Sequence, residues 1–67
     1  MKLKCIMQNV RKDKNMTQAQ LSKLSGVTIT MISGIENNHT FPNIYTLYKL
    51  AIALDCKVDD LYIVLSK

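Results

Sequence analysis

The sequence lacks the residues on which several kinds of protein depend. Its 67 residues include no tryptophan, two cysteines and a single histidine, His39. Cys5 and Cys56 are too few and too far apart for a metal cluster, so we expect reduced core thiols and no bound metal. No apolar run approaches the roughly 18 residues of a membrane span, and the start MKLKCIMQNVRKDK has no signal-peptide core. We therefore expect a cytoplasmic protein with no membrane partner.

The patterns that carry catalysis are also missing. The sequence has no glycine-rich phosphate loop and no spacing typical of metal ligands. A single histidine, two separated cysteines and clustered surface acids provide no pair of nucleophile and base. We expect no enzyme activity, no cofactor and no small-molecule ligand.

The sequence is rich in apolar residues, and its charged residues are unevenly distributed. Hydrophobic residues make up 48%, which is typical of a globular chain, and 67 residues lie near the lower limit for one domain that folds alone. The net charge is +4. Residues 1–26 carry six lysines and arginines against one aspartate, whereas residues 27–67 carry three lysines against four acidic residues. The basic segment suits a surface that meets a polyanion; the alternative is an ordinary soluble surface that happens to be basic.

The stretch Thr17–Asn37, TQAQLSKLSGVTITMISGIEN, predicts two short helices joined by a tight turn. Thr17 and Gln20 have the spacing of a capping box, in which each side chain bonds the backbone N–H of the other residue. Gly26 supplies the positive φ that ends a helix, and Thr28 can cap the next one. Apolar residues fall at helical spacing in both halves: Leu21 and Leu24, then Ile32 and Ile35. Two helices around one such turn are the arrangement that places a helix in the major groove of DNA.

Both ends of the chain allow two interpretations. A first helix is expected over about residues 3–13, with Val10 and either Ile6 or Met7 facing inward, together with Leu3. The segment MKLKCI, however, also alternates like a short strand. A short fifth helix is expected around residues 59–65, whereas the tail YIVLS is β-branched enough to be a strand that pairs with MKLK.

A fourth helix is predicted over about residues 44–54. Asn43 can cap it, and Asn15 and Asn38 suit positive φ in the turns before the second and fourth helices. Its inner stripe is Ile44, Leu47, Leu50, Ala51 and Leu54. Five helices joined by loops of two to six residues predict a compact all-α domain.

Three motifs together resemble one family. They are MTQAQLSKLSGV, then TxxxISGIEN, then FPNIYTLYKLAIALDCKVDDLY, and they cover about residues 6–62 almost without gaps. This pattern is similar to the Cro/phage-repressor (XRE-like) helix-turn-helix regulators. The resemblance implies a single five-helix, lambda-repressor-like domain over residues 1–67, with the helix-turn-helix at its second and third helices. It also implies a sequence-specific transcriptional regulator, a repressor or an activator, that binds a near-palindromic double-stranded DNA operator as a homodimer.

The resemblance also implies roles for individual residues. The recognition helix, residues 28–37, would face the bases with Thr28, Ile29, Thr30, Ser33 and Gly34. Phosphate contacts would come from Gln18, Asn37, Asn38, His39 and Thr40. Arg11 and Glu36 would form an ion pair between the first and third helices. Two simpler interpretations stay open, since Gln18 can be just an exposed helix former and His39 a solvated loop residue.

The recognition helix departs from the family pattern at Ile29 and Gly34. Relatives often carry arginine, glutamine or lysine there, and such side chains bond guanine or adenine edges. In this chain Ile29 and the methyl group of Thr30 could pack on thymine methyl groups, and Gly34 could allow a close approach. We therefore predict a T-rich site with affinity dominated by phosphate contacts; the alternative is drift towards weak or non-specific binding.

A second apolar stripe predicts a partner surface. It comprises Tyr45, Tyr48 and Ile52 on the fourth helix, and the tail, residues 63–67, adds Ile63, Val64 and Leu65. The simplest partner is a second copy, although some of these residues could instead cover the small core. A different class of function is an antitoxin-like or adaptor protein that binds a protein partner through this face, with DNA binding secondary.

Overall fold

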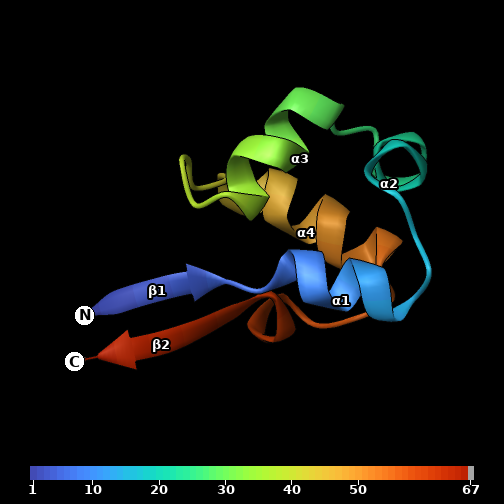
Figure 1. Ribbon diagram of the computed structural model, residues 1–67. Helices are drawn as coiled ribbons and strands as arrows, with labels where there is room; N and C mark the ends of the chain where they lie inside the picture. The colour runs from blue at the N-terminus through green and yellow to red at the C-terminus, as the bar shows by residue number, and fades with distance from the viewer. Residues whose placement is uncertain (67) are drawn as a thin grey trace.

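The computed structural model describes residues 1–66, which form a helical body and a two-stranded ribbon (Figure 1). The elements in order are β1 (Lys2–Cys5), α1 (Met7–Asp13), α2 (Gln18–Ser25), α3 (Ile29–Glu36), α4 (Ile44–Ala53), the 3-10 helix η1 (Val58–Leu61) and β2 (Tyr62–Ser66). The strands leave the body side by side, and the start of β1 and the end of β2 lie at the free end of the ribbon (Figure 1). Within residues 1–66, every helix is too short or too polar to cross a bilayer.

The expectation of five helices and an all-α fold is wrong at both ends of the chain. The first helix begins at Met7 rather than near residue 3, and the expected fifth helix is a single 3-10 turn followed by a strand. Strands β1 and β2 pair antiparallel, with Leu3 opposite Val64 and Cys5 opposite Tyr62. Pairing gives the extended backbone of each segment its hydrogen bonds, so the strand interpretation of MKLKCI and YIVLS is the correct one.

Local signals set the ends of the other helices as predicted. Thr17 forms the capping box with Gln20, at 3.1 Å from Oγ1 to the Gln20 nitrogen and 2.8 Å for the return bond. Thr28 caps α3 and Asn43 caps α4. Gly26, Asn15 and Asn38 all have positive φ. One such position was not expected: Asp55, with φ 52°, turns the chain just after α4.

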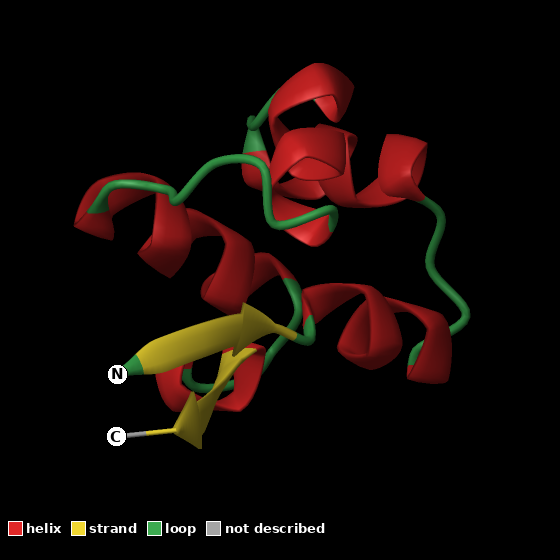
Figure 2. Cartoon of the chain, turned by 60° about the vertical axis from the view of Figure 1, so that its left-hand side comes forward, coloured by secondary structure: helices red, strands yellow, loops and turns green. Residues whose placement is uncertain are grey.

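Figure 2 shows the two strands at one edge of the group of helices. The core lies mainly among the helices, and Cys5 at the end of β1 also belongs to it. Its fully buried side chains are Met7, Leu21, Ile32, Ile35, Leu50, Leu54 and Leu61. Two residues placed on apolar stripes by helical spacing are exposed instead, Leu24 in the last turn of α2 and Ile44 in the first turn of α4. Leu3, expected on the inner face of a first helix, is 39% exposed on β1. Helical spacing alone therefore does not determine which apolar side chains are buried.

Candidate nucleic-acid interface

Helix α3 presents its N-terminal part to solvent. Thr28, Ile29 and Thr30 are exposed, and the Thr28 hydroxyl accepts a hydrogen bond from the Met31 backbone N–H at 3.2 Å. Ile32, Ile35 and Glu36 are buried on the opposite side of the helix. The helix is therefore anchored through one face, and the free face carries short or apolar side chains.

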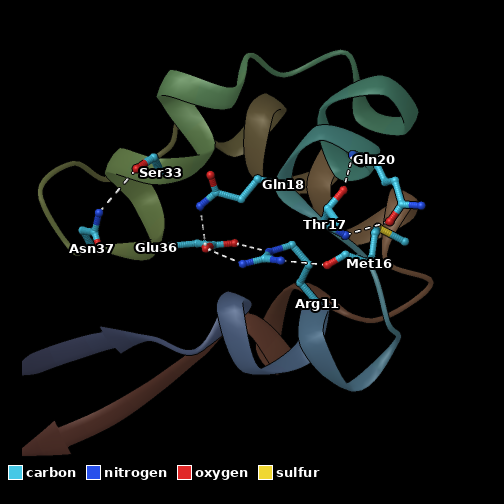
Figure 3. A network of polar contacts seen from close by, with 8 residues as sticks. All are labelled: Arg11, Met16, Thr17, Gln18, Gln20, Ser33, Glu36 and Asn37. Atoms are coloured by element: carbon cyan, nitrogen blue, oxygen red, sulfur yellow. Dashed lines mark hydrogen bonds and ion pairs between the residues drawn. The ribbon is translucent and has the colours of Figure 1, made fainter.

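A buried ion pair joins α3 to α1 (Figure 3). The Arg11 guanidinium donates to both carboxylate oxygens of Glu36, from Nε to Oε2 at 2.7 Å and from Nη2 to Oε1 at 3.1 Å. Its Nη1 donates to the Met16 carbonyl oxygen at 2.7 Å, just before α2. The side chains of Arg11 and Glu36 are only 7% and 1% exposed. The hydrogen bond to Glu36 raises the pKa of Arg11. The pair joins α1 to α3, and the bond to Met16 extends the network to the segment just before α2.

Gln18 belongs to the same network (Figure 3). Its Nε2 donates to Glu36 Oε1 at 3.0 Å, which gives this first residue of α2 a contact with the end of α3. The simpler interpretation of Gln18 as only an exposed helix former does not hold, because the side chain is half-buried and bonded. An amide nitrogen carries two N–H groups, so one donor remains for a further acceptor such as a phosphate oxygen.

The loop between α3 and α4 brings four predicted residues to the surface beside α3. They are all exposed: Asn37, Asn38, His39 and Thr40. The Asn38 Oδ1 accepts a hydrogen bond from the Cys5 backbone N–H at 2.9 Å, so this side chain also ties the loop to β1. The Asn37 Nδ2 donates to Ser33 Oγ at 3.4 Å on the surface of α3.

Gly34 lies against this loop. A Cβ atom built at position 34 would lie 3.2 Å from the Thr40 methyl group. Gly34 is half-buried, and its φ is not positive. The contact with Thr40 explains why a small residue fits at position 34. This explanation is independent of the close approach to DNA that was expected from the sequence.

Folding buries one of the six cationic side chains near the N-terminus and leaves the other five exposed. Arg11 is neutralised inside the body by Glu36, so it does not add to the exposed charge. The other five cationic side chains of this segment are exposed, on β1, at the end of α1 and on α2: Lys2, Lys4, Lys12, Lys14 and Lys23.

The six predicted partner-surface residues are all exposed, but they do not share one face. Tyr45, Tyr48 and Ile52 lie on α4 with exposures of 71%, 54% and 75%. On β2, Val64 is paired with Leu3, whereas Ile63 is paired with Lys4. Successive strand residues point to opposite faces, so Val64 is separated from Ile63 and Leu65.

The cysteines are free thiols in this structure, Cys5 buried and Cys56 half-buried. Burial raises the pKa of both. Among residues 1–66, no group of three histidine, cysteine or acidic side chains is placed to hold a metal.

Sequence reasoning missed two of the contacts between segments that lie far apart in the chain. It did not predict the bond from Gln18 to Glu36 or the bond from the Cys5 N–H to Asn38. The first had an indirect signal, because a bidentate guanidinium fills only two of the roughly four acceptor sites of a buried carboxylate. The second depends on the ribbon and had no local signal.

Comparison with known proteins finds relatives that are named as gene regulators. Residues 7–61 match the model of the helix-turn-helix family. The chain is 36% identical over 61 residues to the cryptic phage CTXphi transcriptional repressor RstR of Vibrio cholerae, an alignment that covers 91% of this chain and 54% of that protein. It is 33% identical over 54 residues to the ImmF control region 10 kDa protein of Bacillus phage phi105, covering 81% and 60%. The chain thus spans little more than half the length of these curated relatives.

Two solved structures are similar in fold. The restriction-modification controller protein C.AhdI from Aeromonas hydrophila superposes with a TM-score of 0.77 at 28% identity, covering 81% of this chain and 82% of that one. An HTH_3 family transcriptional regulator from Vibrio cholerae gives a TM-score of 0.74 at 31% identity, covering 78% and 29%.

Proposed function

This chain belongs to the helix-turn-helix family, of the Cro and phage-repressor type, and on that premise we propose that it regulates transcription by binding double-stranded DNA as a homodimer. The observation that carries the proposal is the free N-terminal face of α3, held by hydrogen bonds that join three helices. A helix anchored through one face and exposed on the other can enter the major groove without rearrangement. The printed names of the relatives, a repressor and a control-region protein, support the same class of function.

We propose that bases are read by short and apolar side chains. Ile29 is 47% exposed and Thr30 is exposed beside it, so an isoleucine side chain and a threonine methyl group are available to thymine methyl groups. The hydroxyls of Thr28, Thr30 and Ser33 can bond base edges or phosphates. Gly34 adds no side chain, so at that position only the helix backbone would be offered to the groove. This chemistry favours a T-rich half-site.

Phosphate contacts would position the domain on both sides of the groove. On one side, Gln18 has an N–H group to spare beyond its bond to Glu36. On the other side, the exposed loop offers Asn37, Asn38, His39 and Thr40. Asn38 would contribute through its amide nitrogen or backbone, because its oxygen is bonded to β1.

A two-fold dimer would place two α3 helices about one DNA turn apart on a near-palindromic operator. Each half-site would then be read by the same short side chains. The spacing between half-sites is therefore a geometric prediction of the homodimer, measurable by footprinting a duplex selected from a random pool.

The proposal is tested by fluorescence anisotropy with that selected duplex. Ile29→Ala should weaken binding by about 1–3 kcal/mol and relax the base preference at one position in each half-site. Ile44→Ala is the matched control, since Ile44 is 66% exposed on α4, outside the proposed reading face. The logarithm of the affinity should also fall by about 0.9 per neutralised phosphate for each tenfold rise in salt. No salt-dependent binding to any duplex from the pool would overturn the proposal.

The exposed apolar side chains of α4 favour a second candidate, in which a different protein binds this face and DNA binding is secondary. A DNA-binding measurement on the purified chain distinguishes the two candidates. Specific duplex binding by the chain alone supports the regulator, whereas binding that requires an added protein supports the adaptor.

A further inference from the structure

The two-stranded ribbon carries side-chain charge of one sign. Strands β1 and β2 contain Lys2 and Lys4 and no acidic residue. Both lysines are exposed. The ion pair found within residues 1–66 is the one between Arg11 and Glu36 in the helical body, so it neutralises neither lysine. The ribbon is therefore a cationic projection from the body.

The two lysines share the face of β1 that is turned away from α4. Leu3 is opposite Val64 and Lys2 is opposite Ser66, so the extra residue of this irregular register lies on β2. Strand β1 keeps its alternation, with Leu3 on one face and Lys2 and Lys4 on the other. Leu3 lines a hollow together with residues of α4 and η1. The free face of α3 also points away from α4, since the buried side of α3 packs in the core with α4.

A hydrogen bond ties β1 to the loop that is proposed to contact phosphates. The Cys5 backbone N–H donates to Asn38 Oδ1 at 2.9 Å. Because Lys4 is the neighbouring residue in the chain, its Cα lies about 3.8 Å from that of Cys5. Figure 1 shows the ribbon projecting from the body on the side where the loop between α3 and α4 lies. The lysine-bearing strand therefore continues the surface that the loop begins.

The spacing of the lysines suits the DNA backbone. Residues two apart in an antiparallel strand are separated by about 7 Å. Each strand of duplex DNA carries a phosphate about every 3.4 Å along the helix axis. Lys2 and Lys4 can therefore reach different phosphates of one DNA strand. A lysine ammonium binds phosphate as a point charge on a flexible stem, so the contact requires no fixed geometry.

We propose that the ribbon forms a further DNA contact, in which Lys2 and Lys4 bind backbone phosphates next to those contacted by the loop after α3. This inference rests on the proposed function and extends its contacts beyond the helix-turn-helix segment Thr17–Asn37. The ribbon adds affinity and salt dependence but no base preference, because phosphate contacts carry no sequence information.

Salt titrations with a duplex of one half-site, followed by fluorescence anisotropy, test the contact. Lys2→Gln and Lys4→Gln should each reduce the slope of log affinity against log salt by about 0.9, and the double variant by about 1.8. Lys57→Gln is the matched control, because it removes the same charge from an exposed lysine beside α4. Its slope should equal that of the unmodified chain.

Neutral phosphates locate the contact. A methylphosphonate replaces one charged phosphate by a neutral group, and a contact already lost in a variant is not lost again. At one or more positions this replacement should weaken binding of the unmodified chain several-fold and leave binding of the double lysine variant unchanged. Those positions should adjoin the ones at which Asn37→Ala abolishes the effect of the replacement. Base preference should be the same in the double lysine variant and the unmodified chain.

The outcomes separate this inference from the proposed function, once circular dichroism has established that each variant is folded. If both lysine variants keep the slope of Lys57→Gln, the ribbon inference is wrong while the proposed function stands, and the lysines only keep the edge strands from pairing with other chains. A reduced slope without any phosphate position specific to the lysines would overturn it too, because the charges would then act only at long range. If the chain binds every duplex equally and the lysine variants still reduce the slope, the ribbon contacts DNA and the proposed reading of sequence is wrong instead.

Discussion

Glu36 bonds residues from two other helices through a single buried carboxylate. It accepts from Arg11 on α1 and from Gln18 on α2, while Arg11 also holds the Met16 carbonyl oxygen. Helix α3 is thus positioned by hydrogen bonds as well as by Ile32 and Ile35 in the core. Its orientation depends on a residue that would touch no DNA.

Glu36→Ala should lower the free energy of unfolding by about 3–5 kcal/mol, because it strands the buried Arg11 guanidinium. For a domain of this size that is a large part of the total stability. Urea titration followed by circular dichroism measures it. Replacing both partners, as Arg11→Met with Glu36→Leu, should recover much of the loss, since no charge is then left unpaired. If Glu36→Ala lowered the free energy of unfolding by less than about 1 kcal/mol, the pair would not be what holds the three helices together.

Tyr62 supplies a second prediction for a single side chain. Its hydroxyl is buried without a hydrogen-bond partner among residues 1–66. Tyr62→Phe should therefore leave the free energy of unfolding at neutral pH unchanged or raise it by up to about 1 kcal/mol. Tyr48→Phe, which removes a hydroxyl from an exposed ring, isolates the effect of burial. A clear destabilisation by Tyr62→Phe alone would mean that the hydroxyl has a partner.

The same burial makes stability depend on alkaline pH. Burial raises the pKa of Tyr62 and of Cys5 above their ordinary values of 10.0 and 9.0. The unfolded chain then releases these protons at lower pH than the folded one. The difference in pKa between the two states contributes to the free energy of unfolding. This contribution is fully present below about pH 9 and is lost as the pH rises towards the pKa values of the folded chain. Urea midpoints between pH 8 and pH 11 should fall, and the fall should be smaller in Tyr62→Phe; equal falls in both proteins would contradict this assignment.

At the scale of elements, the sequence predicted the structures that depend on neighbouring residues, and it did not settle those that depend on pairing between distant segments. The caps at Thr17, Thr28 and Asn43 act within three residues of the helices they begin, so the sequence located those helix starts correctly. The ribbon pairs Leu3 with Val64, at opposite ends of the chain, and no local pattern distinguishes this from two helices. The Arg11–Glu36 pair was expected from a family resemblance, whereas the partners of Gln18 and Asn38 depend on tertiary placement.

The packing of α3 against the loop that follows it predicts how a substitution at Gly34 changes stability. Gly34→Ala gains about 1 kcal/mol of helix propensity but brings a Cβ to 3.2 Å from the Thr40 methyl group. In the unmodified chain the gain should therefore be reduced or cancelled. In a Thr40→Ser background, which removes that methyl group, Gly34→Ala should stabilise by close to the full amount. Thermal unfolding of the four proteins measures the coupling, and additive effects would show that Thr40 does not constrain position 34.

At the scale of the whole molecule, two tasks fall to different parts of the 67 residues. The free face of α3 is proposed to read bases, and the buried hydrogen bonds of Glu36 hold that helix in place. The proposed homodimer carries two such faces. DNA with two half-sites should therefore be bound more tightly than two independent domains would bind it, which fluorescence anisotropy with one-site and two-site duplexes measures.

The central claim is that α3 reads DNA through Ile29 and its short neighbours, and replacement of thymine by uracil in the selected duplex tests it most directly. Uracil lacks only the methyl group, so hydrogen bonding and backbone charge are preserved. The account predicts that uracil at one position of each half-site weakens binding of the unmodified chain by about 1 kcal/mol or more and has little effect on Ile29→Ala. Equal losses in both proteins, or no loss at any thymine, would contradict it.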